Sequence, residues 1–151
     1  INAMNLTRIK GSPYYNENYF SYDYLSRAKK GLIFINVTRG EIAPEPVLLK
    51  LYDQGVLGGI GLDVFSNEHD FSLAVQKGQV ETVNNRVAAA LVLLQMAESR
   101  MGNIYVQPHQ GFNSDLAVES KAADTISHMI SWYQNGKKRF DEQLPYYQDV
   151  I

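Results

Sequence analysis

The alternation of apolar and polar positions along the chain predicts three strands. Residues 32–37 read LIFINV, an apolar run with β-branched side chains, and we expect a strand that is buried on both faces of a parallel sheet. Residues 57–64 predict a second strand, whose glycines Gly58, Gly59 and Gly61 indicate a closely packed neighbour such as a covering helix. Residues 104–106 predict a third, short strand.

Helical spacing of apolar positions predicts helices around these strands. One covers residues 21–30 and ends in Lys29-Lys30-Gly31, and a second runs from Ala43-Pro44 to Gly55 with proline in its first turn. A third spans Asn84 to Glu98 with Asn84 or Asn85 as N-cap. A fourth begins at Ser114 and runs to about Asn135, with a buried face formed by Leu116, Ala123, Ile126, Ile130 and Tyr133. Residues 66–79 are polar and mixed, so Glu68 is expected in a loop.

Strands that alternate with helices through short connections predict an α/β fold with a doubly wound, mostly parallel sheet and flanking helices. The 151 residues, 45% of them hydrophobic, suffice for one ordinary core. In such sheets ligands bind beyond the carboxyl ends of the strands. Candidate functional residues are therefore sought at those ends.

Composition narrows the classes of function. A net charge of −2, a pI near 5.9 and scattered cations argue against nucleic acid as a partner. No cysteine occurs, which fits a reducing compartment, and we expect a cytoplasmic protein. The longest apolar run, Val87 to Leu94, is far shorter than the roughly 20 residues of a membrane helix, so no membrane partner is expected. The three histidines have no metal-ligand spacing, and we expect no metal.

Three strand ends carry chemically useful side chains. Arg39 follows the first strand, Asp63 and Glu68 follow the second, and His109 follows the third. A guanidinium can bind a carboxylate through two parallel hydrogen bonds, and a histidine can exchange a proton near neutral pH. A carboxylate beside that histidine would fix its tautomer. These side chains could together act on a substrate that has a carbonyl group next to a carboxylate. Transfer of a hydride to that carbonyl would need a cofactor.

The same stretches resemble a known family. INVTRGE at 35–41, GIGLDVF at 59–65 with Glu68 after it, and QPH at 107–109 look like the signature blocks of the D-isomer-specific 2-hydroxyacid dehydrogenases. AMNLT at 3–7 resembles the segment before those blocks, and the resemblance extends to about Ser131. It implies the second half of a Rossmann-like NAD-binding domain over residues 1–135, then a tail over 136–151. It also implies hydride transfer between NAD(H) and a 2-keto or 2-hydroxy acid.

The resemblance implies a role for each matching residue. Arg39 would bind the substrate carboxylate and keto oxygen, His109 would be the general acid and base, and Glu68 would be its partner. Asp63 would hydrogen-bond the nicotinamide side of the cofactor. The remaining cofactor-binding residues implied are Ala3, Met4, Asn5, Val37, Thr38 and Gly111.

Two departures from the family shape the expectation. The glycine fingerprint that binds the dinucleotide phosphates is absent, and so is a substrate domain. We therefore expect a fragment of a longer, homodimeric NAD-dependent enzyme, inactive alone, with NADP not excluded. The alternative is a non-catalytic NAD-sensing or dimerisation module of the same family.

Each key residue also has a structural interpretation. Arg39 could cap backbone carbonyls, Asp63 could start a turn, Glu68 could be a solvated carboxylate, and His109 could be a loop histidine.

Overall fold

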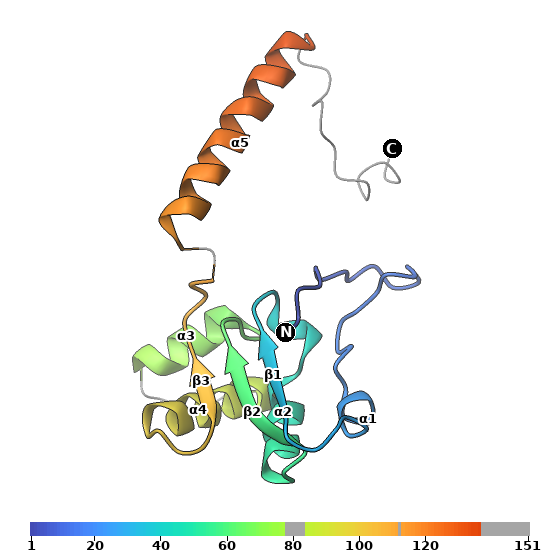
Figure 1. Cartoon of the computed structure of the whole chain (residues 1–151), viewed down its shortest axis with the longest axis vertical. Coiled ribbons are helices and arrows are strands. Elements are labelled where there is room, and N and C mark those ends of the chain that lie inside the picture. Colours follow the sequence, from blue (N-terminus) through green and yellow to red (C-terminus); the bar gives the residue numbers. More distant parts are fainter. Residues whose placement is uncertain (78–83, 112, 137–151) are drawn as a thin grey trace. The chain divides into compact units, whose positions relative to one another are not determined.

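The computed structural model of the chain describes residues 1–77, 84–111 and 113–136 and divides into two units, residues 1–110 and residues 111–151. The regular elements of the first unit are α1 (Tyr22–Leu25), β1 (Leu32–Asn36), the 3₁₀ helix η1 (Gly40–Ile42), α2 (Glu45–Asp53), β2 (Leu57–Leu62), α3 (Glu68–Lys77), α4 (Asn85–Glu98) and β3 (Ile104–Val106) (Figure 1). The second unit contributes α5 (Asp115–Gln134). None of these helices is long and apolar enough to cross a membrane.

The three strands form one parallel sheet in the order β1-β2-β3. Asn36 of β1 lies beside Leu62 of β2, and Leu62 lies beside Val106 of β3, so the carboxyl ends of all three strands are aligned. Each pair of neighbouring strands is connected through helices, as parallel pairing requires. The predicted α/β fold with a parallel sheet and flanking helices is confirmed.

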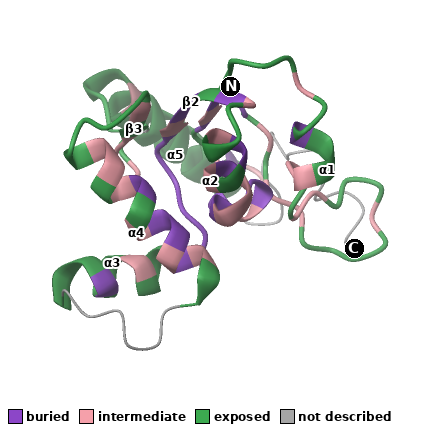
Figure 2. Ribbon diagram, turned by 90° about the horizontal axis from the view of Figure 1, so that it is seen from below, coloured by how far each residue is buried: buried purple, intermediate pink, exposed green. Residues whose placement is uncertain are grey.

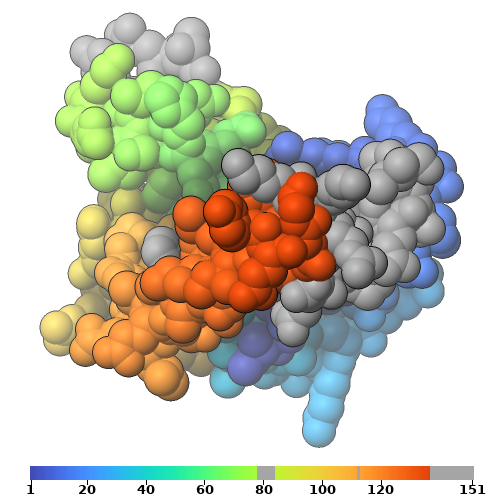
Figure 3. All heavy atoms as spheres, turned by 90° about the horizontal axis from the view of Figure 1, so that it is seen from above, coloured from blue at the N-terminus to red at the C-terminus, as the bar shows by residue number. Residues whose placement is uncertain are grey.

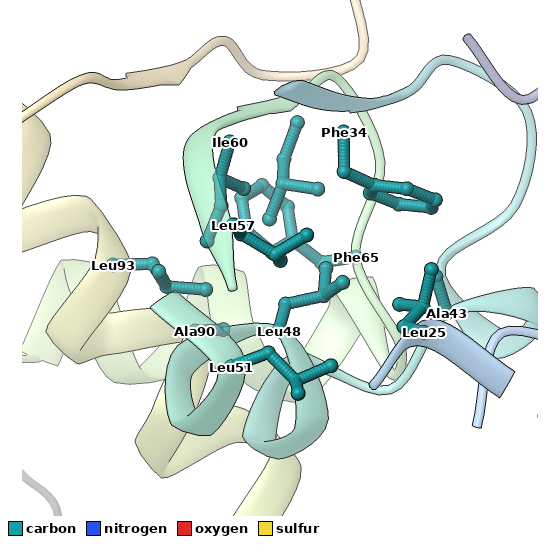
Figure 4. Packing of buried hydrophobic residues seen from close by; sticks show 11 residues of the cluster. Leu25, Phe34, Ala43, Leu48, Leu51, Leu57, Ile60, Phe65, Ala90 and Leu93 are labelled. Atoms are coloured by element: carbon teal, nitrogen blue, oxygen red, sulfur yellow. The ribbon is translucent and has the colours of Figure 1, made fainter. Parts of the chain in front are cut away.

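The core lies between the sheet and helices α2 and α4. Leu48 and Leu51 of α2 and Leu93 of α4 are fully buried, and they gather with Leu57 and Ile60 of β2 (Figure 4). Figure 2 shows the buried residues along β2 and on α2 and α4 in purple. Burying a leucine contributes about 1.5–3 kcal/mol, so this cluster fixes the two helices against the sheet.

Among the described residues of the first unit, nothing covers the opposite face of the sheet, which corrects the expectation of a strand buried on both faces. Phe34 and Asn36 are buried, whereas Ile33, just before Phe34, is 56% exposed, and Tyr105 of β3 is 66% exposed. Helices α2, α3 and α4 lie on one face of the sheet, behind the strands in Figure 1. The apolar run at residues 32–37 therefore predicts more burial than the described residues provide.

The glycines of β2 meet other neighbours than the expected helix. A Cβ on Gly58 would clash with the backbone of Gly31, and one on Gly59 would lie 2.4 Å from the side-chain nitrogen of Asn103. A Cβ on Gly61 would lie 3.3 Å from Ile35 of the neighbouring strand. The small residues in β2 thus make room for a turn and for side chains of adjacent segments.

The helix predictions hold in part. Asn84 caps α4 and Ser114 caps α5, each through its side-chain oxygen, as predicted. The first helix is only four residues long and ends at Leu25 instead of reaching residue 30. Residues 68–77 form α3, a helix that the mostly polar sequence of this segment did not predict. The expectation that Glu68 lies in a loop was therefore wrong. Ala74 is the only buried residue of α3, which leaves little hydrophobic pattern to recognise.

Helix α5 in the second unit lacks the predicted buried face. Four of the five residues assigned to that face are large, and all four are exposed: Leu116, Ile126, Ile130 and Tyr133. Only Ser131 is buried on this helix, and the orange-to-red atoms of α5 are open to view in Figure 3. The apolar spacing was correctly identified as helical, but burial of its side chains requires a partner surface.

Candidate active site

The aligned strand ends bring the candidate residues to one edge of the sheet. Arg39 lies three residues beyond the Asn36 position, Asp63 directly follows Leu62, and His109 lies three residues beyond Val106. All three positions belong to the first unit, so their common edge is defined by the strand register. The structure therefore places these three residues at the carboxyl ends of the strands, as expected from the sequence.

His109 and Glu68 form a direct pair. The imidazole Nδ1 of His109 lies 3.0 Å from Oε2 of Glu68, and both side chains are about two-fifths exposed. Glu68 is the first residue of α3, and its other oxygen accepts a hydrogen bond from the backbone N–H of Phe65 at 3.3 Å. When Nδ1 carries the proton that Glu68 accepts, Nε2 remains as the nitrogen that can exchange a proton with a substrate.

The backbone around His109 is held onto the end of β2. The N–H of His109 donates to the carbonyl oxygen of Asp63 at 2.7 Å, and the N–H of Gln110 donates to the Asp63 carboxylate at 2.6 Å. His109 has a φ of 52°, a left-handed conformation that is uncommon for a residue with a side chain. Such conformations concentrate at functional sites because the surrounding structure must enforce them.

Asp63 is buried, with 5% of its surface exposed. One of its carboxylate oxygens accepts the hydrogen bond of Gln110 described above. The side chain therefore joins the ends of β2 and β3, which goes beyond the role of an aspartate that starts a turn.

Arg39 is exposed in the turn after β1. Its Nη1 donates to the carbonyl oxygen of Thr38 at 2.7 Å, so the backbone-capping interpretation describes one contact that it makes. A guanidinium has five N–H donors, and this contact uses one of them. The backbone carbonyl of Arg39 accepts a hydrogen bond from the side chain of Asn36 at 3.0 Å, which fixes the turn that carries the guanidinium.

Besides Asp63, the residues expected to bind the cofactor lie in three places. Ala3, Met4 and Asn5 lie in the extended N-terminal segment, where the Met4 N–H donates to the side chain of Asn2. Val37 and Thr38 follow β1, and Thr38 accepts a hydrogen bond from Asn2 at 2.9 Å. Gly111 is the first residue of the second unit, whereas the other expected cofactor-binding residues belong to the first.

An open pocket of about 300 Å³ lies on the uncovered face of the sheet. Val37 and Asp63, two of the expected cofactor-binding residues, line it together with apolar side chains of β1 and with Tyr105. The catalytic candidates Arg39, Glu68 and His109 are not among its lining residues. The pocket therefore adjoins the cofactor candidates rather than the histidine–glutamate pair.

Two buried polar residues that shape this edge were missed by sequence reasoning. Asn36 is fully buried, and its side chain links Asn2 to the backbone of Arg39. Glu45, at the start of α2, is 1% exposed and accepts a hydrogen bond from the backbone N–H of Ser66. For Glu45 the sequence does hold a signal, because it lies three residues before the buried Leu48 on the same helix face.

Burial raises the pKa of the Glu45 carboxyl above its ordinary value, while the hydrogen bonds from Ser66 and the positive charge of Arg86 oppose that shift. Charged carboxylates are poorly solvated inside a protein, which favours the neutral form.

Among the described residues no group of histidine, aspartate and glutamate side chains could hold a metal ion.

Two curated relatives illustrate the sequence similarity. The D-specific alpha-keto acid dehydrogenase of Enterococcus faecium is 30% identical over 114 residues, which are 74% of this chain and 32% of that protein. The D-lactate dehydrogenase of Staphylococcus epidermidis is 26% identical over 117 residues, covering 78% of this chain and 33% of that protein. The chain thus spans about a third of the length of the curated relatives it matches.

Solved structures share the fold. The D-lactate dehydrogenase from Aquifex aeolicus, complexed with NAD and lactic acid, superposes with a TM-score of 0.62 and 24% identity, covering 81% of this chain and 34% of that one. D-2-hydroxyisocaproate dehydrogenase superposes with a TM-score of 0.65 and 21% identity, covering 83% and 35%.

The family itself is decided by its sequence model. The model described as "D-isomer specific 2-hydroxyacid dehydrogenase, NAD binding domain" matches residues 13–111, about two thirds of the chain. That range contains Arg39, Asp63, Glu68 and His109. The chain belongs to the D-isomer-specific 2-hydroxyacid dehydrogenase family and matches its NAD-binding domain.

Proposed function

We propose that this chain supplies the catalytic half of the cofactor domain of an NAD-dependent D-2-hydroxyacid dehydrogenase, with Arg39, Glu68 and His109 as catalytic residues. The observation that carries the proposal is the 3.0 Å contact between His109 Nδ1 and Glu68 Oε2 at the carboxyl edge of a parallel sheet. Contacts between a carboxylate and a histidine are common on protein surfaces. This pair, however, lies at the same edge of the sheet as Arg39.

The chemistry follows from the side chains. Arg39 would hold the carboxylate of a 2-keto acid and draw electron density toward the keto oxygen. His109 would donate a proton from Nε2 to that oxygen as the carbonyl becomes an alcohol, and it would accept the proton in the reverse reaction. Glu68 would stabilise the imidazolium and hold the ring in the required tautomer. NADH, when bound, supplies the hydride that reduces the carbonyl carbon.

The residues present fit the nicotinamide end of the cofactor. Asp63 is a buried carboxylate at the end of β2, where it can accept hydrogen bonds from an amide, and Val37 offers an apolar side chain next to the same open pocket. Thr38 adds a hydroxyl at the end of β1. We propose these three, with Ala3, Met4 and Asn5, as residues that would line the cofactor site, and Gly111 as a further contact. NADP is an alternative that these residues do not distinguish from NAD.

The first test is kinetic and uses the full-length protein that carries these residues. We expect NADH-dependent reduction of small 2-keto acids to the D-2-hydroxy acids. His109→Ala is expected to lower kcat/KM by about 10²–10⁴-fold, because general acid–base catalysis contributes that much. NADH binding, measured by titration of its fluorescence, should stay close to that of the unmodified protein. His128→Ala in α5 is the matched control and should leave the rate unchanged.

The results also separate this proposal from its alternative. Unchanged turnover in His109→Ala would contradict the assignment of the acid–base residue. NADH binding without turnover of any 2-keto acid would favour the non-catalytic NAD-sensing or dimerisation module. The 151-residue chain assayed alone is expected to show no turnover, because the glycine fingerprint for the cofactor phosphates is not in its sequence.

Two broader assignments belong to the same proposal. We propose that the intact protein is a cytoplasmic homodimer that acts on a small 2-keto or 2-hydroxy acid. Light scattering of the intact protein tests the assembly, with twice the monomer mass as the expected result. Residues 1–135 as half of a cofactor domain, with 136–151 as a tail, remain a prediction, and residues 137–151 lie outside the described part of the chain.

A further inference from the structure

The loop that joins β2 to α3 carries both Asp63 and Glu68, so its course decides where the partner of His109 lies. Within it, Ser66 is 1% exposed, and Asn67 takes a left-handed conformation with a φ of 54°. Glu68 follows immediately as the first residue of α3. A small change at Ser66 would therefore be passed to Glu68 through only two backbone positions.

Three contacts from other segments hold this loop. The backbone N–H of Ser66 donates to Glu45 Oε1, from the first residue of α2. The Ser66 hydroxyl accepts a hydrogen bond from Arg86 Nη1 at 3.1 Å, from the first turn of α4. Gly40 packs so closely that a Cβ there would lie 2.0 Å from the carbonyl carbon of Phe65 and 2.1 Å from the nitrogen of Ser66.

Glu45 is an unusual choice for the first of these contacts. The side chain is 1% exposed, and Oε2 has no hydrogen-bond partner among the described residues. Burying a carboxylate with one oxygen unpaired is unfavourable, and burial raises the pKa of the Glu45 carboxyl above its ordinary value. An apolar side chain would fill this space without that penalty, but it could not accept the Ser66 N–H.

The contacts form a continuous path to the proposed acid–base residue. Glu45 holds Ser66, the neighbouring Phe65 N–H donates to Glu68 Oε1, and Glu68 Oε2 meets His109 Nδ1. Glu45 thus acts on the loop that leads to Glu68, whereas the turn of Arg39 meets the same loop through the close packing of Gly40.

We propose that Glu45 is a positioning residue that sets the Glu68–His109 pair by holding the backbone N–H of Ser66. This inference rests on the proposed function for its catalytic meaning, but its structural claim concerns the pair alone. It requires an acceptor of glutamate length at residue 45 rather than a charge.

The test reads the pair directly by NMR of the 151-residue chain with ¹⁵N-labelled histidine. The ring nitrogen signals of His109 report its hydrogen bond and tautomer, and Glu68→Gln sets the size of the response when the carboxylate is lost. Glu45→Asp shortens the side chain, so we expect at least half of that response. Glu45→Leu removes the acceptor and should give a response at least as large. Glu45→Gln keeps an oxygen at the same reach and should leave the His109 signals in place.

Controls separate a specific effect from loss of structure. Glu98→Gln on the exposed end of α4 is the matched control and should move nothing at His109. Near-ultraviolet circular dichroism shows whether each variant is folded. If Glu45→Leu does not fold, Glu45→Asp decides the matter. A folded Glu45→Asp variant whose His109 signals match those of Glu98→Gln would overturn the proposal.

A second readout links the pair to catalysis in the intact enzyme. Glu45→Asp should lower kcat several-fold and change KM for the keto acid little, with activity kept in Glu45→Gln. Because the NMR result does not depend on turnover, a positioned pair without any dehydrogenase activity would count against the proposed function only. An unmoved pair in an active enzyme would count against the role of Glu45 only.

Discussion

At the scale of single residues, Gly40 shows how a small side chain can be dictated by a neighbour far along the chain. Its backbone angles are ordinary for any residue, so conformational freedom is not the reason for glycine here. The reason is the contact with the Phe65–Ser66 backbone, which lies too near to admit a Cβ. Backbone atoms within a hydrogen-bonded loop cannot swing aside as the tip of a flexible side chain would.

Gly40→Ala is therefore expected to displace the loop that carries Glu68. The unfolding free energy should fall by about 1–3 kcal/mol, the usual penalty of overpacking, in urea unfolding followed by circular dichroism. The His109 ring signals should also move. Gly55→Ala is the informative comparison: φ is +69° and nothing lies within 4 Å, so it adds about 1–2 kcal/mol of backbone strain without touching the loop. Equal effects of both variants on His109 would argue against the close contact.

Sequence reasoning located the exposed chemistry of the site more readily than its buried supports. Arg39 and His109 stand out because they lie shortly after apolar runs, whereas Glu68 was proposed from the resemblance of its segment to the family. Asn36 and Glu45 do not stand out, since their hydrogen bonds join positions 34 and 21 residues apart. A polar side chain inside an apolar pattern signals burial, but the sequence alone cannot name its distant partner.

At the scale of elements, α4 is the helix that closes the core over the sheet. Val87, Ala90 and Leu93 are fully buried at spacings of three residues, along one stripe of the helix. Leu93→Ala should reduce the unfolding free energy by about 2–5 kcal/mol, through lost burial and the cavity left behind. Val92→Ala, one residue earlier and 41% exposed, should change it by less than about 0.5 kcal/mol. Urea unfolding of both variants measures the difference, and similar losses would contradict the assigned stripe.

The elements that sequence reasoning missed or misjudged share a physical cause. Helix α3 buries only Ala74, so its apolar stripe is too sparse to stand out. The error for β1 and α5 is the opposite one. Their apolar residues predict burial, but the described residues leave many of them exposed. Local patterns indicate which surfaces can be buried, whereas actual burial depends on what packs against them.

At the scale of the whole molecule, the buried Glu45 makes stability depend on pH. Burial raises its folded pKa above the unfolded value of about 4.3, against the opposing effects of Ser66 and Arg86. The folded state then binds the proton more tightly than the unfolded state. The stabilisation from this group is fully present below the unfolded pKa and is lost as pH rises through the raised folded pKa.

Glu45→Gln replaces the titrating carboxyl with a neutral amide, so comparing this variant with the unmodified chain isolates the pH dependence that Glu45 causes. Near pH 4 the variant and the unmodified chain should have similar Tm values, because Glu45 is then largely neutral. As the pH rises to about 7, the Tm of Glu45→Gln should increase relative to the unmodified chain. Differential scanning calorimetry across this range measures the shift, with Glu98→Gln expected to show a flat difference. A Tm that falls for Glu45→Gln as pH rises would mean that the charge itself stabilises the fold.

The aligned strand ends have a consequence for how such a site tolerates insertions and deletions. Lengthening a turn before a strand, at the opposite edge of the sheet, would change that turn and leave the ladder of hydrogen bonds intact. Removing one residue inside β2 would instead shift Asp63 and Glu68 together by about 3.3 Å and turn every side chain of the shifted part of the strand to the other face. It would also misplace His109, whose backbone N–H is bonded to the Asp63 carbonyl. Changes of length are thus tolerable in the turns at the opposite edge of the sheet, but not within the strands that set the spacing of the site residues.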